Sequence, residues 1–156
     1  YPMSEFMELF QKTKDLGMPF TIHAGECGNA QNIVDAVSVG AGRIGHGIAM
    51  RGKPDVQKLV REAGVGVEMC PISNLQTKAV NGPSEYPLRE FLDSGICVTI
   101  NTDNRTVSNT SMTKELEFIQ KPYGICDDEI LLLMRNAAEC DFAKEDVKNR
   151  LKMLMR

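Results

Sequence analysis

Apolar residues along the chain alternate between helical spacing and short continuous runs, and glycine or proline separates the two patterns. Helical spacing begins near Phe6, behind Ser4 as an expected N-cap, and it stops at Gly17. The next segment, PFTIHAGE at 19–26, is a short β-branched run that is typical of a strand. The same alternation continues along the chain and predicts a series of helices and strands.

Three further strands and six further helices are predicted from these signals. The strands are RIGHG at 43–47, VGVEMC at 65–70 and ICVTINTD at 96–103. The helices begin after Asn29, at Pro54, at Leu88, near Ser111, at Asp127 and near residue 144. Residues 71–87 are predicted to form a loop. Strands that are short and apolar on both faces, with helices between them, indicate a parallel sheet covered by helices.

Each predicted strand stays apolar until its carboxyl end and then presents polar side chains. These side chains are His23 and Glu26, then His46, then Ser73 and Asn74, and finally Asp103. In parallel α/β folds the active site lies at this edge, whether the sheet is a closed barrel or an open doubly wound sheet. We therefore expect all these side chains at one rim.

Composition and charge exclude several classes of protein. A chain of 156 residues with 42% hydrophobic and 25% charged residues belongs to the globular class rather than the disordered one. The net charge is −3 and the basic residues are dispersed, so nucleic acid and anionic lipid are not expected partners. No apolar stretch reaches membrane-spanning length, and the first residues lack a signal-peptide layout. We therefore expect a cytoplasmic protein without a membrane partner.

The five cysteines form no CxxC pair and are odd in number. This pattern favours reduced thiols, buried as small hydrophobic side chains, over a disulfide framework.

The polar strand ends carry residue types that suit a metal-dependent hydrolase. Zinc takes imidazole nitrogen and carboxylate oxygen, and a catalytic site needs about three or four protein ligands with one position left for water. His23 and Asp103 can supply two ligands, Glu26 suits a proton shuttle, and His46 can hold or deprotonate the bound water. The same residues fit several hydrolytic schemes, so spacing alone leaves the reaction open.

Four strand-end motifs resemble those of the adenosine deaminase family, in the same order. They are TIHAGE at 21–26, RIGHG at 43–47, CPISN at 70–74 and NTD at 101–103. RNAAECDFAKED at 135–146 is similar to the family's C-terminal helices. The resemblance implies an α/β fold: the C-terminal half of a TIM (β/α)₈ barrel of the metallo-dependent hydrolase type, followed by helices.

A full barrel needs about 250 residues, so residues 1–156 would be a single partial domain with about the last four βα units. The chain begins without Met and opens in a helical pattern, which also suggests a missing upstream segment. The family's first strand brings two more zinc ligands as an HxH pair that this sequence lacks. With an incomplete zinc site, the chain alone is expected to be inactive, and its open sheet edges predict self-association.

The reaction implied by the resemblance is zinc-dependent hydrolytic deamination of adenosine to inosine and ammonia, a step of purine salvage. A zinc-activated hydroxide would attack C6 of the purine. His23 and Asp103 resemble the zinc ligands, Glu26 the residue that protonates purine N1, and His46 the residue that orients the hydroxide.

Two further positions, 45 and 104, concern the choice of substrate, and two others, 73 and 74, concern the surroundings of the metal. Family members acting on adenine tend to carry Asp where this chain has Gly45, so a purine nucleoside, adenosine, is favoured. Asn104 stands where many members have an Asp that contacts purine N7, and an amide can donate there without a pKa shift. Ser73 and Asn74 fit equally well as second-layer groups near the metal and as loop caps.

Three alternatives stay open. The chain could be a catalytically silent half-barrel that acts as an assembly or interaction module, or part of a deaminase of a related purine such as adenine. It could also be a self-contained doubly wound domain with His46 as general base, although no GxGxxG fingerprint is present. The H-x-E and P-C-x-x-C signature of the cytidine deaminase class is absent.

Overall fold

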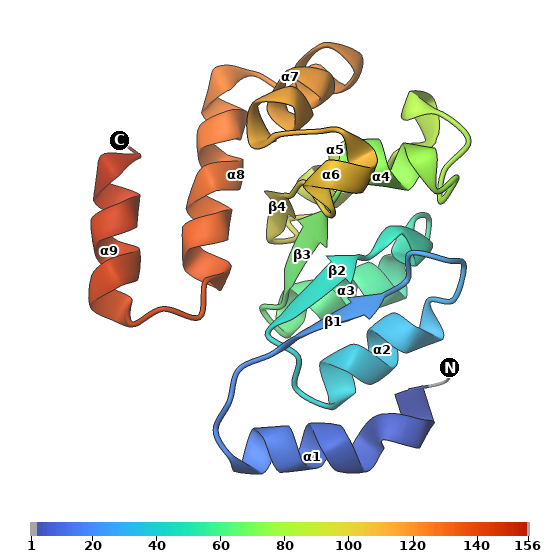
Figure 1. The fold of residues 1–156 in the computed structure, drawn as a ribbon, viewed down its shortest axis with the longest axis vertical. Helices are drawn as coiled ribbons and strands as arrows, with labels where there is room; N and C mark the ends of the chain where they lie inside the picture. The colour runs from blue at the N-terminus through green and yellow to red at the C-terminus, as the bar shows by residue number, and fades with distance from the viewer. Residues whose placement is uncertain (1–2, 156) are drawn as a thin grey trace.

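A sheet of four parallel strands forms the centre of the structure, a computed structural model that describes residues 3–155 (Figure 1). The strands lie in chain order: β1 (Thr21–Ala24), β2 (Arg43–His46), β3 (Gly66–Met69) and β4 (Val98–Ile100). Ile22 pairs with Ile44, Ile44 with Val67, and Val67 with Val98. Within the described sheet, β1 and β4 each have one neighbour, so the outer edge of each is not paired with another strand.

Helices connect the strands and continue after the last of them. They are η1 (Met3–Phe6), α1 (Met7–Asp15), α2 (Gln31–Ser38), η2 (Ile48–Met50), α3 (Pro54–Glu62), α4 (Pro71–Gln76), η3 (Pro83–Glu85), α5 (Leu88–Asp93), α6 (Arg105–Ser108), α7 (Met112–Tyr123), α8 (Asp127–Cys140) and α9 (Glu145–Leu154). The elements marked η are 3₁₀ helices, and α8 packs mainly on β4, with α9 antiparallel to it (Figure 1). Across residues 3–155, no helix has both the length and the hydropathy that a bilayer span requires.

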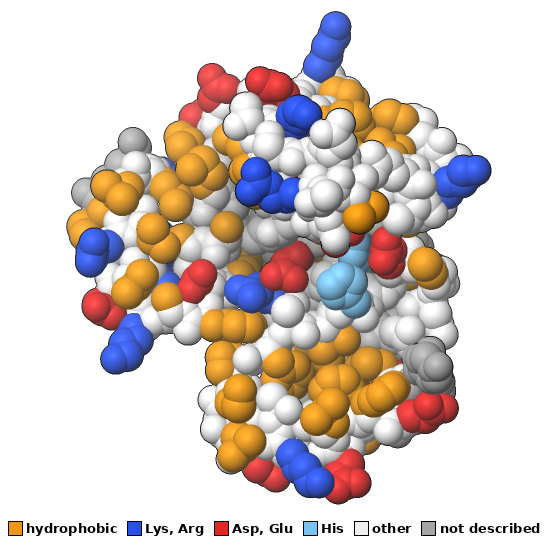
Figure 2. Space-filling model, viewed as in Figure 1, with side chains coloured by type: hydrophobic (Ala, Val, Ile, Leu, Met, Phe, Trp, Pro, Cys, Tyr) orange, Lys and Arg blue, Asp and Glu red, His pale blue; other side chains and the backbone are white. Residues whose placement is uncertain are grey.

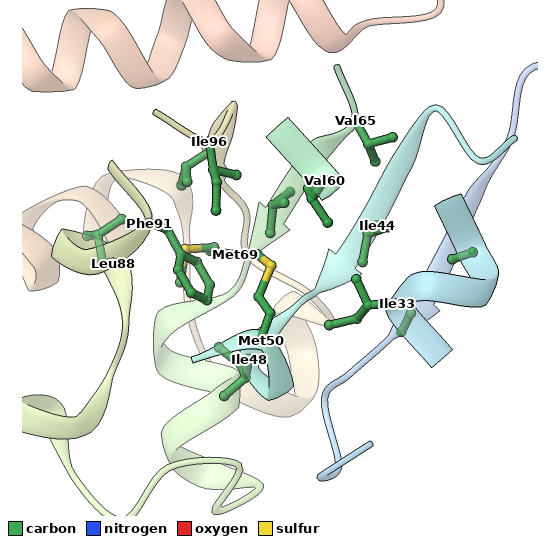
Figure 3. Packing of buried hydrophobic residues seen from close by; sticks show 14 of the residues in the cluster. Ile33, Ile44, Ile48, Met50, Val60, Val65, Met69, Leu88, Phe91 and Ile96 are labelled. Atoms are coloured by element: carbon green, nitrogen blue, oxygen red, sulfur yellow. The ribbon is translucent and has the colours of Figure 1, made fainter. Parts of the chain in front are cut away.

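The main core lies between the sheet and the helices that connect its strands (Figure 3). Its fully buried side chains include, from the strands, Ile44, Val67, Met69 and Val98, and, from α2, α3 and α5, Ile33, Val60 and Phe91. Each large side chain buried in this way contributes about 1.5–3 kcal/mol. The four strands pair in parallel and in register, so their carboxyl ends lie together at one rim of the sheet.

The opposite face of the sheet is polar, so the expectation of strands apolar on both faces is wrong. Arg43 Nε lies 2.9 Å from Glu68 Oε1, and the Thr21 hydroxyl donates to Glu68 Oε2 at 2.8 Å. The ring of Phe142 covers this network, with its centroid 3.9 Å from the guanidinium carbon of Arg43. The charges are tolerated because they are paired with one another and each remains partly exposed.

Residues 71–87, expected to be a loop, contain the short helices α4 and η3. Pro71 stands in the first turn of α4, where its missing N–H costs nothing. Glu115, from α7, accepts a hydrogen bond from the backbone N–H of Ile72 at 3.1 Å. The N-terminus of α4 is therefore satisfied from a distant helix, which no local pattern could show.

The fourth strand ends at Ile100, three residues earlier than the expected boundary at 103. Asp103 has φ +52°, a left-handed conformation that cannot continue an extended strand. Asn104 then caps the short helix α6, because its side-chain oxygen accepts the Val107 N–H at 3.0 Å.

Two expected N-caps are displaced by one residue. Ala30, not Asn29, is the N-cap of α2, although Asn29 Oδ1 accepts a backbone N–H of the first turn at 2.8 Å. Cys126, not Asp127, is the N-cap of α8, since Asp127 already has helical geometry. The side chain of Ser4 lies outside the described residues.

An ion pair ties α8 to α5. Arg89 donates to both carboxylate oxygens of Glu129, at 3.1 Å to Oε2, and also to the Tyr123 carbonyl at 3.1 Å. The hydrogen bonds from Arg89 lower the pKa of Glu129 from 4.5 to about 2. Because the folded-state pKa is the lower one, this stabilisation is fully present above pH 4.5 and is lost as the pH falls toward 2.

Replacing Glu129 with Gln is therefore expected to remove this part of the acid sensitivity. It should also lower the free energy of unfolding at neutral pH by roughly 1 kcal/mol, since the pair is partly exposed. Urea denaturation at neutral pH and between pH 4.5 and 2 measures both effects. Glu62→Gln is the matched control, because Glu62 is exposed and its contact with Lys58 is a loose one, at 3.9 Å. Equal pH dependence in the two variants would contradict the assignment.

Candidate active site

A cavity of about 310 Å³ opens at the carboxyl ends of the strands. Its wall is formed by His23, Gly45, His46, Glu68, Cys70, Asn101, Thr102, Asp103 and Met112. Figure 2 shows histidine side chains at a hollow near the middle of this face, with acidic groups beside them. All four strands or the residues that directly follow them contribute to the wall, as expected from the polar strand ends.

His23, His46 and Asp103 form a group that can hold a metal ion. Each offers one ligand atom, and these atoms all lie within 4.8 Å of one another. The two imidazole rings have centroids 4.9 Å apart. Imidazole nitrogen together with carboxylate oxygen suits a transition-metal ion such as zinc better than calcium or magnesium, which favour oxygen alone. The residues present therefore fit a metal cofactor.

Asp103 is held in position by Ser73 of α4. The Ser73 hydroxyl donates to Asp103 Oδ2 at 2.6 Å. The pKa of Asp103 is lowered, first by this hydrogen bond and then by the neighbouring His46 and His23. Asp103 is thus an ionised carboxylate at neutral pH, as a metal ligand must be.

His46 is buried and constrained from two sides. It has φ +70°, so the backbone turns sharply where β2 ends and directs the ring toward the rim. Its Nδ1 lies 2.9 Å from Nδ2 of Asn74, which is itself fully buried. In this orientation the amide donates to Nδ1, so Nε2 carries the proton of the neutral ring. Tyr86 contacts the Asn74 amide from the other side, with its hydroxyl 3.5 Å from Oδ1.

Glu26 lies beside His46 rather than in the wall of the 310 Å³ cavity. Its Oε2 is 3.5 Å from His46 Nε2, and its Oε1 accepts a hydrogen bond from the Thr77 hydroxyl at 3.3 Å. The carboxyl group also borders a second cavity of about 190 Å³, next to Arg51 and Lys53. Glu26 therefore lies directly beside His46, one member of the group that can hold a metal.

Gly45 allows His23 to lie against β2. A Cβ atom at position 45 would be 3.3 Å from His23 Nδ1, which is tighter than ordinary packing. A side chain at position 45 would require the His23 imidazole to shift by a few tenths of an ångström, so glycine favours this close arrangement.

Three residues that support the site could not be identified from the sequence. Asn104, which could, lies apart from the cavity. Thr77 and Tyr86 fall within the segment interpreted as a loop, and no pattern marks them. Glu115 is fully buried and binds the start of α4, but it resembles any charged residue of an amphipathic helix. Asn104 directly follows Asp103 and is exposed, with its side-chain oxygen engaged in capping α6.

Comparisons with known proteins agree with this geometry. The family described as adenosine deaminase matches residues 1–155. An adenosine deaminase of Enterococcus faecalis is 44% identical over 151 residues, which are 97% of this chain and 45% of that protein. Among solved structures, an adenine deaminase from Arthrobacter aurescens superposes with a TM-score of 0.93 at 30% identity, covering 99% of this chain and 47% of that one. An Arabidopsis N6-mAMP deaminase gives a TM-score of 0.88 at 25% identity, covering 99% and 46%.

The chain spans about half the length of the curated relatives it matches, at 45% of the Enterococcus protein. The solved relatives extend in the same way beyond the part they share with this chain. The half-barrel sheet, the order of its motifs and the family match over nearly every residue lead to one assignment. This chain belongs to the adenosine deaminase family.

Proposed function

We propose that the protein containing this chain carries out zinc-dependent hydrolytic deamination of adenosine to inosine and ammonia, as a cytoplasmic step of purine salvage. The observation that carries the proposal is the group of His23, His46 and Asp103, whose ligand atoms lie within 4.8 Å of one another, with Glu26 beside it. The direct test is incubation of the purified protein with adenosine and zinc, followed by chromatographic measurement of inosine and ammonia.

His23 and Asp103 are the residues of this chain that would hold zinc. When bound, zinc activates a water molecule as the nucleophile. Ser73 keeps the Asp103 carboxylate oriented and ionised through the 2.6 Å hydrogen bond. The family resemblance implies two more histidine ligands in a segment that these 156 residues lack.

His46 would orient the attacking oxygen, and Glu26 would protonate the purine. His46, with its proton on Nε2, donates a hydrogen bond that orients the attacking oxygen toward C6. Glu26 delivers a proton to purine N1, which makes C6 more electrophilic. Glu26 Oε2 and His46 Nε2 are 3.5 Å apart, so the two side chains can reach purine N1 and the oxygen that attacks the adjacent C6.

Adenosine is favoured over adenine by two observations. The 44% identical relative is named an adenosine deaminase, whereas the adenine deaminase is 30% identical. Position 45 is glycine, which lets His23 lie against β2, whereas family members acting on adenine tend to carry Asp there. We expect a higher kcat/KM for adenosine than for adenine.

Asn104 is proposed to donate its amide N–H to purine N7. Asn104→Leu is expected to raise the KM for adenosine by about 10-fold, because one hydrogen bond is lost. Asn104→Ser separates this role from capping, since serine retains an acceptor for the Val107 N–H but lacks the amide. Both variants should raise KM, whereas the exposed control Asn149→Leu on α9 should not. An unchanged KM in both Asn104 variants would remove the contact.

A second candidate is an assembly module, favoured by the unpaired edges of β1 and β4 in the described sheet. An apolar cavity of about 220 Å³ beside β4 adds surface that a second copy could cover. It is lined by Ile100, Met112, Leu116, Leu133, Met134, Ala137 and Met155. Sedimentation velocity of these 156 residues decides: a dimer supports the module, and a monomer at all concentrations excludes it.

A further inference from the structure

Cys97 and Cys140 stand out among the cysteines because their sulfur atoms touch. All five thiols are free: Cys70 is buried, Cys27 and Cys126 are exposed, and Cys97 and Cys140 are half-buried. Burial as small hydrophobic side chains was thus a correct expectation for Cys70 and wrong for the exposed pair. The Sγ atoms of Cys97 and Cys140 are 2.9 Å apart across 43 residues of sequence, whereas a disulfide bond measures about 2.0 Å.

The two sulfurs are held together by the packing of α8 on β4. Cys97 directly precedes β4, and Cys140 is the last residue of α8. Asn136 of α8 donates its amide to the Val98 carbonyl at 2.9 Å, which fixes the helix against the strand. Arg43 donates to the Cys140 carbonyl at 3.3 Å and so holds the end of α8 over the sheet.

Gly66 permits the close approach of Cys140. A Cβ atom at position 66 would lie 2.5 Å from the Cys140 sulfur, so a side chain there would push the thiol away from Cys97. Gly66, Arg43 and Asn136 together position the two thiols, and neither thiol lines any of the three cavities described above.

We propose that Cys97 and Cys140 form an oxidation site, which small-molecule disulfides convert to an intramolecular disulfide bond between β4 and α8. The Cys97 thiolate attacks the small disulfide, forms a mixed disulfide and releases one thiolate. The Cys140 thiolate then attacks the Cys97 sulfur, forms the protein disulfide and releases the second thiolate. The two protein thiol protons pass to the released thiolates, so one small disulfide yields two small thiols.

The electrostatics support this order of attack. The hydrogen bond between the two sulfurs lowers the pKa of Cys97 and raises that of Cys140. Burial raises the pKa of Cys70 to about 12, so that thiol is inert by comparison.

The test is to treat the folded, purified protein with oxidised glutathione and to count free thiols after denaturation. We expect the count for this chain to fall from five to three, with a mass loss of two hydrogens and no retained glutathione. Digestion without reduction should yield one linked peptide pair, containing Cys97 and Cys140. The melting temperature should rise by several degrees, reversibly with dithiothreitol, because the link closes a long loop.

Single replacements make the outcome decisive. Cys97→Ser and Cys140→Ser should each abolish the link, and Cys97→Ser should also prevent the mixed disulfide at this site. Cys27→Ser and Cys126→Ser, at exposed thiols, should leave the link intact. Circular dichroism of every variant verifies that it is folded before oxidation. A bridge between other cysteines, a glutathione adduct that persists on Cys97, or five unreacted thiols would each overturn the proposal.

Discussion

Replacing Glu26 with Gln is expected to lower kcat for adenosine deamination by about 10²- to 10⁴-fold, the usual contribution of a general acid. Gln keeps the size of the side chain and an oxygen that can still accept the Thr77 hydroxyl at 3.3 Å. It cannot release a proton to purine N1. The loss should therefore appear in kcat, with little change in zinc content or in the melting temperature.

Initial rates of inosine formation by the full-length protein measure this effect, together with zinc content determined by plasma emission spectrometry. Glu62→Gln on α3 is the matched control, since it makes the same chemical change at an exposed carboxylate outside the site. Turnover of Glu26→Gln equal to that of Glu62→Gln, with zinc retained in both, would exclude Glu26 as the acid.

Replacing Asp103 with Asn is expected to have the largest effect on metal binding. The change removes the ionised ligand while keeping a side chain that still accepts the Ser73 hydroxyl through its amide oxygen. Loss of a residue that only hydrogen-bonds to a metal ligand typically lowers metal affinity by ~10- to 100-fold. Loss of the ligand Asp103 itself should lower zinc affinity by more than this. Activity at limiting zinc should fall in parallel.

Ser73→Ala provides a graded comparison for Asp103→Asn. It removes the 2.6 Å hydrogen bond that lowers the pKa of Asp103 but leaves the carboxylate itself. Zinc titration against a chromophoric chelator should rank affinity as wild type, then Ser73→Ala, then Asp103→Asn. Equal zinc affinity in wild type and Asp103→Asn would show that Asp103 is not a ligand.

The sheet and the location of the site could be predicted because strand ends carry a local signal. The runs around His23, His46 and Asp103 change from apolar to polar within a few residues, and parallel strands place such changes at one edge. The family resemblance then supplied the half-barrel fold, which the structural relatives confirm.

The parts that could not be predicted depend on contacts distant in sequence. Helix α4 was interpreted as a loop because its N-terminus is satisfied by Glu115, more than 40 residues away, at 3.1 Å from Ile72 N. Its placement decides how Ser73 and Asn74 lie, and their side chains contact Asp103 and His46. Their roles in the reaction stay predictions.

The polar face of the sheet was missed for a related reason. Arg43 and Glu68 look like isolated charges in the sequence, and only the register of β2 and β3 shows that they form an ion pair. Similarly, the contact between Cys97 and Cys140 spans 43 residues and depends on α8 lying over β4.

The central claim is that an imidazole of β1 and the aspartate after β4 bind the same zinc ion. An anomalous difference map at the zinc edge, from crystals of the full-length protein grown with zinc, tests it most directly. We expect a peak at about 2.0–2.2 Å from both a His23 ring nitrogen and an Asp103 carboxylate oxygen. A peak bound by neither residue, or none at this rim while zinc binds elsewhere, would contradict it.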